Sequence, residues 1–259
     1  MTIHPTALVD PGAEIGDGAV VGPWCRVEAG ARLAAGVELA SSVVVHSHTD
    51  IGEGTVVHPF AVLGGAPQHG GYKGEPTRLV IGARNIIREH ATLHRGTVQG
   101  GGLTRVGEGC LFMVGAHIAH DCMVGDGVTF ANNAVIGGHV QVGDGAFLGG
   151  QSAVHQWCRV GKGAILGGGA VATRDVIPFG SAWGNHARLE GLNMVGLKRR
   201  GFDKARIRRM LKLFDALFHG EGLFEDRLAR AEAEYADLDE AREIITFIRD
   251  GGSRPLCRP

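Results

Sequence analysis

The sequence predicts an all-β solenoid, a parallel β-helix of hexapeptide repeats, followed by a small C-terminal α-helical domain. First, an aliphatic or phenylalanine residue recurs at every sixth position over residues 3–63 and again over residues 106–166. Second, a small or β-branched residue stands two positions before most of them, as Ala7 does before Val9. Third, apolar residues take helical spacing near the C-terminus. A short fixed period indicates a solenoid, and a period of six is typical of a parallel β-helix.

Each hexad is expected to form one short strand and one corner. The small residue and the next aliphatic residue are two apart, so both side chains point inward from the same strand. The residues between strands are rich in Gly and Asp and form the corner, where glycine adopts left-handed backbone angles without strain. Three hexads of six residues close a triangular coil of 18, so residues 18 apart lie one above the other on the same edge. The hexads suffice for between eight and nine coils.

Composition excludes several classes of protein. The net charge of −1 argues against a nucleic-acid-binding protein. Only 6% of residues are aromatic, which fits a narrow interior without room for rings. The first residues show neither a basic nor an apolar run, so we expect a cytoplasmic protein with no signal peptide and no membrane span.

The cysteines are interpreted as structural. Four of the five, Cys25, Cys110, Cys122 and Cys158, occupy the small inward position of their hexads. Cysteine at such a position behaves as a small apolar side chain, and a cytosolic setting keeps it reduced.

Two polar, glycine-rich insertions interrupt the hexads, at residues 64–79 and 94–105. Both are too long to be simple corners, and insertions in a solenoid usually carry function. With these insertions included, the β-helix is expected to span residues 1–185 and the helical domain residues 186–259.

Three helices are expected in the second domain. Apolar residues at helical spacing from Ile207 to Phe218 predict the first, with Asp203 as its N-cap and Gly220 just past its end. Two more are expected at about residues 223–235 and 238–250. The Gly- and Pro-containing tail beyond them is expected to be frayed.

Histidines gather on one edge of the predicted prism. Adding 18 places Gly138 above His120, Gln156 above Gly138, and Trp157 above His139. The residues expected on this edge are His117, His120, Asp121, His139, His155 and Gln156. Stacked histidines could bind zinc, as they do in trimeric β-helix carbonic anhydrases.

General-base catalysis is the favoured alternative. His120 would take a proton, Asp121 would orient it, and the N–H of Gly138 would stabilise an oxyanion. This interpretation gives Asp121, Gln156 and the two insertions a role, whereas zinc binding does not. A non-catalytic scaffold would need only the hexads.

Several runs of residues resemble the UDP-N-acetylglucosamine acyltransferase family that begins lipid A synthesis. Outside the insertions they are His117-Ile-Ala-His-Asp-Cys122, Ala131-Asn-Asn-Ala134, Gly138-His-Val140, Val154-His-Gln156, Gly184-Asn-His-Ala187 and Gly196-Leu-Lys-Arg-Arg-Gly-Phe202. Tyr72-Lys-Gly-Glu-Pro-Thr-Arg78 and His94-Arg-Gly-Thr97 match within the insertions. The resemblance covers the whole chain, and its most specific runs begin at His117 and Gly196.

The resemblance implies a left-handed parallel β-helix that forms a homotrimer, with active sites between neighbouring subunits. The implied reaction transfers a (3R)-hydroxyacyl group from acyl carrier protein to the glucosamine 3-hydroxyl of UDP-N-acetylglucosamine, without a metal or other cofactor. His120 would be the base, Asp121 its orienting carboxylate and Gly138 the oxyanion donor.

The resemblance also implies roles in substrate binding. The UDP-sugar would be held by His117, His139, Gln156, Asn193 and Arg199. Gln68 and His94 would line the acceptor pocket, and His155 would lie near the pantetheine arm of the donor. Gly168 would act as a ruler for the acyl chain, and as a glycine it predicts that long chains are accepted.

Charge and three departures from the family pattern bear on the substrates. The stretch from Arg188 to Lys212 contains nine basic residues and only two acidic ones, which favours docking of an acidic carrier protein. His69 and Gly71 stand where better-known members carry Asp and Lys, and Val195 stands in place of a Glu. Because these positions lie at the acceptor end, the acceptor could be the 3-hydroxyl sugar or its 3-amino analogue.

Overall fold

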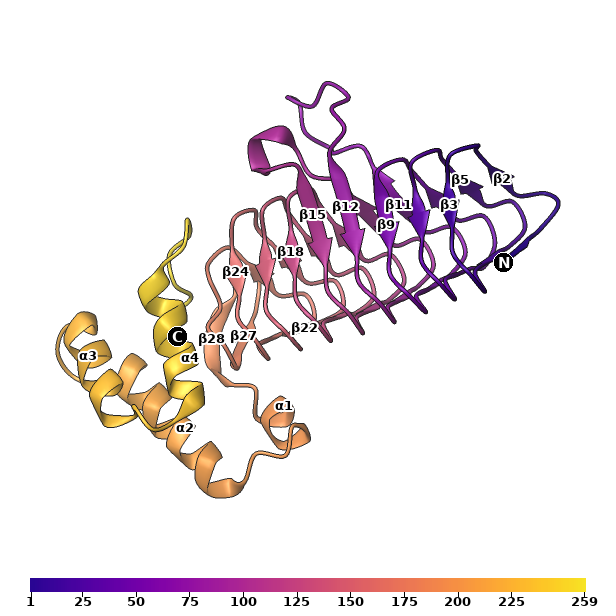
Figure 1. Cartoon of the computed structure of the whole chain (residues 1–259). Coiled ribbons are helices and arrows are strands. Elements are labelled where there is room, and N and C mark those ends of the chain that lie inside the picture. The colour runs from indigo at the N-terminus through magenta and orange to yellow at the C-terminus, as the bar shows by residue number, and fades with distance from the viewer.

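The computed structural model describes residues 1–259 as a long three-sided prism with a cluster of helices at its C-terminal end (Figure 1). The hexads form 26 short strands, β1 to β26, which are distributed over three sheets. We call these sheets A, B and C, and each side of the prism is one of them.

Sheet A contains β1 (Thr2–Ile3), β4 (Val20–Val21), β7 (Glu38–Leu39), β10 (Val56–Val57), β13 (Ile86–Ile87), β16 (Leu111–Phe112), β19 (Thr129–Phe130), β22 (Phe147–Leu148), β25 (Ile165–Leu166), β27 (Gly180–Trp183) and β28 (Arg188–Leu192). Sheet B contains β2 (Leu8–Val9), β5 (Arg26–Val27), β8 (Val44–Val45), β11 (Val62–Gly65), β14 (Thr92–His94), β17 (His117–Ile118), β20 (Val135–Ile136), β23 (Ala153–Val154) and β26 (Val171–Ala172). Sheet C contains β3 (Glu14–Ile15), β6 (Arg32–Leu33), β9 (Thr49–Ile51), β12 (Arg78–Ile81), β15 (Leu103–Val106), β18 (Met123–Val124), β21 (Gln141–Val142) and β24 (Arg159–Val160).

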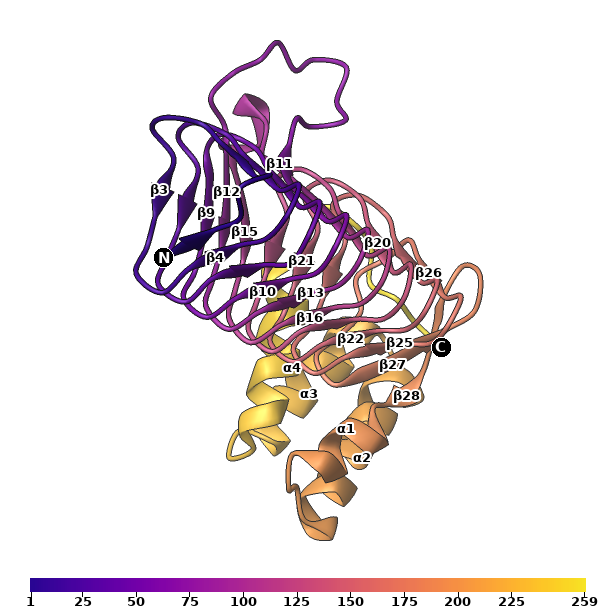
Figure 2. The same cartoon turned by 90° about the vertical axis from the view of Figure 1, so that its right-hand side faces the viewer.

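The register of the sheets follows the hexads. Each of the strands β1 to β23 pairs in parallel with the strand three later, and Thr2 lies opposite Val20, 18 residues on. In Figure 2 the N-terminal end faces the viewer and the chain turns anticlockwise as it recedes. The coil is therefore left-handed, unlike the right-handed crossovers that dominate parallel sheets.

The prism interior is one continuous apolar core. The inward positions of each hexad are buried, as Ala19 and Val21 are at 0% and 1% exposure. Phe112 and Phe130 are also fully buried, one above the other, with ring centroids 5.1 Å apart. The expectation that the interior has no room for rings was wrong, because two rings in successive coils can fill it together. The cysteines are all buried and unpaired, as predicted.

Both insertions leave the prism at the same edge, the one between sheets B and C, which we call the BC edge (Figure 1). The first insertion joins β11 to β12, and the second joins β14 to β15 through a short 3-10 helix at Val98–Gly100. The irregular segments are shorter than predicted, because the ends of both insertions extend the ladder strands.

The C-terminal part contains four helices, α1 (Met194–Arg199), α2 (Lys204–Phe218), α3 (Phe224–Glu234) and α4 (Asp239–Asp250). The last three confirm the predicted helices, and the Asp203 side chain caps α2 by accepting the N–H of Arg206. The antiparallel hairpin β27–β28 and the short α1 were not predicted. The expected domain boundary between residues 185 and 186 falls inside this hairpin. None of the four helices is long and apolar enough to cross a membrane.

The tail beyond α4 is not frayed, contrary to the prediction. Leu256 forms a parallel bridge with Asp175 of the last coil, and the Cys257 N–H donates to the Asp175 carbonyl at 2.7 Å. Cys257 is 1% exposed. The tail therefore closes the open end of the prism core, which explains why a Gly- and Pro-containing segment is ordered.

Candidate active site

The BC edge carries a stack of polar and aromatic residues beside the two insertions. The His139 N–H donates to the His120 carbonyl, and the Trp157 N–H donates to the Gly138 carbonyl, both at 3.0 Å. The predicted stacking of His120 beneath Gly138, and of His139 beneath Trp157, is thereby confirmed. The coil register thus brings together side chains that are far apart in the sequence.

His120 and Asp121 form a buried pair at the centre of this stack. The Nδ1 atom of His120 lies 2.7 Å from Oδ2 of Asp121, and the two residues are 9% and 6% exposed. A carboxylate can only accept in such a bond, so Nδ1 carries the proton and the other ring nitrogen, Nε2, is left with a free lone pair. This is the tautomer that a general base needs.

The second insertion holds the carboxylate of Asp121 in place. Thr97 donates its backbone N–H to Oδ1 at 2.7 Å and its hydroxyl to Oδ2 at 2.6 Å. A Cβ atom on Gly100 would lie 2.1 Å from the Cγ of Asp121, so the loop can approach only because this position is glycine. Thr97 lies in a run that matched the family, but spacing alone gave no sign of its contact with Asp121.

Gly138 lies against the His120 ring. A Cβ atom at Gly138 would be 2.5 Å from Cε1 of the imidazole, so any larger residue would displace the ring. The N–H of Gly138 donates to no acceptor in the protein, whereas the N–H groups on either side of it donate to carbonyls of the ladder. A free N–H beside an imidazole with a free Nε2 is suited to bind a developing negative charge.

His139 is a second imidazole in contact with the pair. It stacks on Trp157 with ring centroids 3.7 Å apart and packs edge-on against His120 at 5.2 Å. Burial lowers the pKa of His139, although the negative charge of Asp121 opposes that shift. His139 is therefore a neutral donor or acceptor at neutral pH.

Ligand atoms of His120, Asp121 and His139 lie within 4.8 Å of one another, so metal binding deserves a test against this geometry. Both oxygens of Asp121 already accept hydrogen bonds from Thr97, and Oδ2 also accepts from His120. A metal would have to replace these bonds. The donor set is thus arranged as a hydrogen-bonded relay and does not fit an open zinc site.

His94 and His117 form a second imidazole pair lower on the sheet B side of the BC edge. Their rings meet edge-on with centroids 5.1 Å apart, and Nδ1 of His117 is hydrogen-bonded to Oγ1 of Thr92 at 2.8 Å. Burial lowers the pKa of His94 to about 4, with a further contribution from positive charge on His117 and His120. Nδ1 of His94 is buried without a partner, so it is available to a ligand.

The first insertion brings His69 to the same place. Its ring lies edge-on to His120, with centroids 5.3 Å apart, and its Nδ1 accepts the N–H of Gly71 at 3.1 Å. Two of the three departures from the family pattern, His69 and Gly71, are therefore in direct contact with each other. Gln68 is exposed on this insertion, and His155 and Gln156 are exposed one corner above His139.

Three of the predicted residues lie elsewhere on this chain. Asn193 and Arg199, with Val195, line a hollow of about 260 Å³ beside the corner that joins sheets C and A. The amide of Asn193 is already engaged, since it caps α1 and donates to the Gly163 carbonyl at 2.9 Å. Gly168 lies on the third edge, between sheets A and B, directly above Gly150. One chain alone therefore does not bring the predicted site together.

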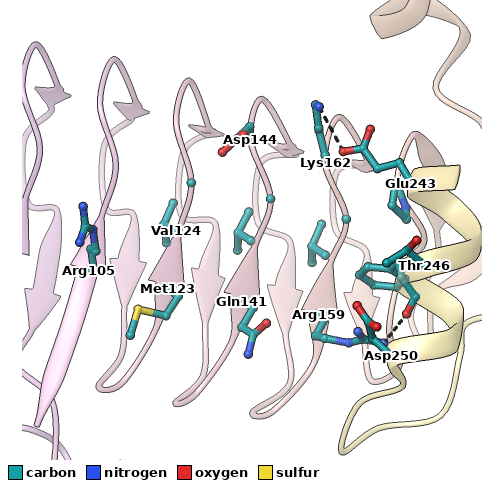
Figure 3. Close-up of a pocket in the computed structure, with 17 residues that line it drawn as sticks. Arg105, Met123, Val124, Gln141, Asp144, Arg159, Lys162, Glu243, Thr246 and Asp250 are labelled. Carbon is teal, nitrogen blue, oxygen red and sulfur yellow. Dashed lines mark hydrogen bonds and ion pairs between the residues drawn. The ribbon is translucent and has the colours of Figure 1, made fainter. Parts of the chain in front are cut away.

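A larger hollow of about 510 Å³ lies between the outer face of sheet C and α4 (Figure 3). Two of its basic groups are paired with carboxylates: Lys162 with Glu243 at 3.1 Å, and Arg159 with Asp175 at 2.7 Å. Arg159 also donates to the Phe247 carbonyl at 3.0 Å. These contacts join the helical part to the prism, and we regard the hollow as a structural joint.

The hexapeptide coil and the histidine–carboxylate pair on one of its edges indicate a hexapeptide-repeat acyltransferase. Residues 103–138 match the family described as bacterial transferase hexapeptide (six repeats). Residues 175–257 match the family described as UDP N-acetylglucosamine O-acyltransferase, domain 2.

Full-length relatives are more specific. The chain is 57% identical over 259 residues to the acyl-[acyl-carrier-protein]–UDP-N-acetylglucosamine O-acyltransferase of Caulobacter vibrioides, covering 100% of this chain and 98% of that one. It is 51% identical to the enzyme of the same name from Rickettsia bellii over 98% of this chain and 91% of that one. The crystal structure of UDP-N-acetylglucosamine O-acyltransferase from Moraxella catarrhalis superimposes with a TM-score of 0.96 at 39% identity, and each chain is fully covered. The chain belongs to the acyl-[acyl-carrier-protein]–UDP-N-acetylglucosamine O-acyltransferase family.

Gly100→Ala is expected to displace the second insertion from Asp121, because the added Cβ would overlap the carboxylate. Overpacking of this kind costs about 1–3 kcal/mol. The matched control is Gly70→Ala in the first insertion, where an added Cβ meets nothing within 4 Å. Thermal unfolding of both variants checks this, and equal melting temperatures would contradict it.

Acid should destabilise the fold through His94. Its pKa is about 4 when folded and about 6.5 when unfolded, so between these values the unfolded chain binds more protons. The free energy of unfolding should therefore fall as the pH drops from about 6.5 to 4, by up to about 3 kcal/mol from this group. Chemical unfolding of wild type and His94→Gln at a series of pH values measures it. The variant should show a shallower pH dependence, and an unchanged slope would refute the assignment.

Proposed function

We propose that this protein transfers a (3R)-hydroxyacyl group from acyl carrier protein to the glucosamine 3-hydroxyl of UDP-N-acetylglucosamine, the first step of lipid A biosynthesis. The observation that carries the proposal is the relay from Thr97 through Asp121 to His120, with the free N–H of Gly138 beside it. The names of the full-length relatives supply the donor and the acceptor.

The reaction follows from the geometry of the relay. Nε2 of His120 removes the proton of the 3-hydroxyl while the oxygen attacks the thioester carbonyl. The carbonyl oxygen becomes an oxyanion, which the N–H of Gly138 stabilises. When the intermediate collapses, the carbon–sulfur bond breaks and the His120 imidazolium returns its proton to the thiolate of the carrier. Asp121 stabilises the imidazolium meanwhile and keeps its orientation.

Three residues near the proposed site bear on the identity of the acceptor. His69 and Gly71 stand in the first insertion beside His120, and Val195 lines the hollow that holds Arg199. A 3-amino analogue of the sugar would use the same base and oxyanion donor and give an amide. A mass-spectrometric assay with both sugars and with hydroxyacyl carrier proteins of graded length decides between them. Formation of neither product would refute the proposed function.

A homotrimer is proposed because of the outer faces of the three sheets. Apolar side chains are exposed on sheets A and B and on the edge between them, namely Leu8, Val20, Trp24, Phe60, Ile86 and Phe147. The outer face of sheet C carries the ion pairs of Arg32 with Glu14 and of Arg78 with Asp50, and Met123 is its one large apolar side chain of comparable exposure. If sheet A of one chain covers sheet B of the next around a threefold axis, the apolar faces are buried.

This arrangement also completes the site. Sheet B ends at the BC edge with His120, and sheet A ends at the edge beside Arg199. When the two sheets face each other, His120 of one chain lies near Asn193 and Arg199 of its neighbour. The predicted ligands of the UDP-sugar, His117, His139, Gln156, Asn193 and Arg199, then surround one cleft, with Gln68 and His94 at its acceptor end.

The donor is proposed to dock near the C-terminal part. α1 and α2 carry basic residues that make no ion pair, among them Lys198, Lys204, Arg208 and Lys212. Arg206 and Arg209 are neutralised, the first by Glu240 at 2.7 Å and the second by Asp237 at 2.6 Å. The basic face is therefore smaller than the sequence predicts, yet still suited to an acidic carrier protein. The free cysteines support a reducing, cytoplasmic location.

His120→Ala should lower the rate of acyl transfer by about 10² to 10⁴-fold, the usual contribution of a general base. The trimer should remain folded, because the ring lies outside the apolar core. The control is His48→Asn, at an exposed corner lower on the same edge, where asparagine tolerates the left-handed backbone. If His120→Ala retains more than a tenth of the wild-type rate, His120 is not the base.

Ile86→Arg should dissociate the trimer and abolish activity, because it places a charge on the outer face of sheet A, where Ile86 is 44% exposed. The matched control is Met123→Arg on sheet C, where Met123 is 41% exposed. Light scattering should give about three times 27.2 kDa for wild type and the control. A trimeric Ile86→Arg variant would contradict the proposed interface.

Gly168→Met should shift the enzyme towards shorter acyl donors. Gly168 is exposed, and a Cβ there meets only the Gly150 carbonyl at 3.6 Å, so the side chain would extend outward into the space proposed for the acyl chain. Gly150→Met, one coil closer to His120 by about 4.8 Å, should shorten the preferred chain further. Kinetics with graded hydroxyacyl donors test both, and an unchanged length preference would end the ruler assignment.

A further inference from the structure

A hollow of about 340 Å³ at the C-terminal end of sheet B is lined by an unusual concentration of positive charge. Its lining includes Arg174 from the BC edge, Arg188 from β28 and Arg258 from the tail, with His186 beside them. None of the three guanidinium groups forms an ion pair with a side chain or with the α-carboxylate of Pro259, which also lines the hollow. Like charges gathered from three segments repel one another unless an anion lies between them.

The three arginines are held in place by the fold. Arg174 follows β26, and the next residue, Asp175, is bridged to the tail through Leu256. The Leu189 N–H donates to the Arg258 carbonyl at 3.1 Å, which fixes the tail beside β28. The guanidinium of Arg258 lies over the ring of Phe224 at 4.7 Å. The ordered tail is therefore a wall of this hollow.

The position of the hollow relates it to the active site. His120, Gly138 and Gln156 are each 18 residues apart and follow one another along the BC edge. Arg174 lies in the next corner, which is shorter because Val176 pairs with Val160, 16 residues before it, and Arg254 of the tail donates to the Gln156 carbonyl there. Arg174 is thus three coils beyond His120, roughly 14 Å at about 4.8 Å per coil. His155, exposed on the same edge, lies between them.

We propose that this hollow binds the phosphate of the phosphopantetheine arm that carries the acyl group. The inference rests on the proposed function, since the donor is an acyl carrier protein. About thirteen bonds separate the thioester sulfur from the phosphorus of such an arm, and at the spacing of an extended peptide these span roughly 15 Å. With the sulfur at His120, the phosphate reaches Arg174. Arginine recognises a phosphodiester through paired, charge-assisted hydrogen bonds.

The test compares two soluble donors, 3-hydroxyacyl-phosphopantetheine and the same thioester without its phosphate. Wild type should use the phosphorylated donor with a kcat/KM on the order of tenfold higher. The variant R174Q/R188Q should lose this preference through KM, while its kcat on the donor without phosphate stays at the wild-type value. Arg32→Gln, on the outer face of sheet C far from the hollow, should keep the preference.

Equal use of the two donors by a wild-type enzyme that acylates the sugar would overturn the inference and leave the proposed function intact. Failure of wild type to acylate either sugar from acyl carrier protein would instead refute the function. In that case the affinity of phosphopantetheine for wild type and for R174Q/R188Q, measured by calorimetry, still tests whether the hollow binds the phosphate. Inorganic phosphate should displace phosphopantetheine. If it binds without competing, the hollow takes free phosphate and the assignment is wrong.

Discussion

The 18-residue register of the backbone ladder is the constraint on which the rest of this structure depends. Parallel strands pair with the strand three later, so every corner residue is stacked on those one coil away. Because the spacing between coils is about 4.8 Å, side chains at successive corners are in contact. His120, Gly138 and Gln156 therefore form a continuous edge, and a single inserted residue would separate the proposed base, His120, from the proposed oxyanion donor, Gly138.

The proposed catalytic residues lie where that regularity is interrupted. Both insertions leave at the BC edge, and the second supplies Thr97, which binds both oxygens of Asp121. The insertion converts an exposed corner into a site where His120 is only 9% exposed. Burial strengthens the hydrogen bonds of the relay, since the local dielectric is low. The coil therefore sets the positions of His120 and Asp121, and the insertions bury them and supply the hydrogen bonds of Thr97.

Much of this could be predicted from the sequence, because the hexad pattern encodes both the coil and its register. The stacking of Gly138 on His120 could be predicted by adding 18, the length of one coil, to the residue number. The contact of Thr97 with Asp121 could not be predicted, since it depends on how a glycine-rich loop folds back. The ordered tail was missed for a similar reason: the tail has little helix or strand propensity, and only its packing against Asp175 orders it. The packing of Phe112 on Phe130 shows that the size of side chain a core position accepts depends on the residue one coil above or below it.

The central claim is that each site is shared between two chains, with His120 from one and Arg199 from the next. Mixing two inactive variants tests it most directly. His120→Ala and Arg199→Ala, unfolded and refolded together, would form mixed trimers in which about one site in four has both residues intact. The account predicts that activity returns to roughly a quarter of the wild-type level. If the mixture stays as inactive as either variant alone, while light scattering shows mixed trimers, the site lies within a single chain and the account is wrong.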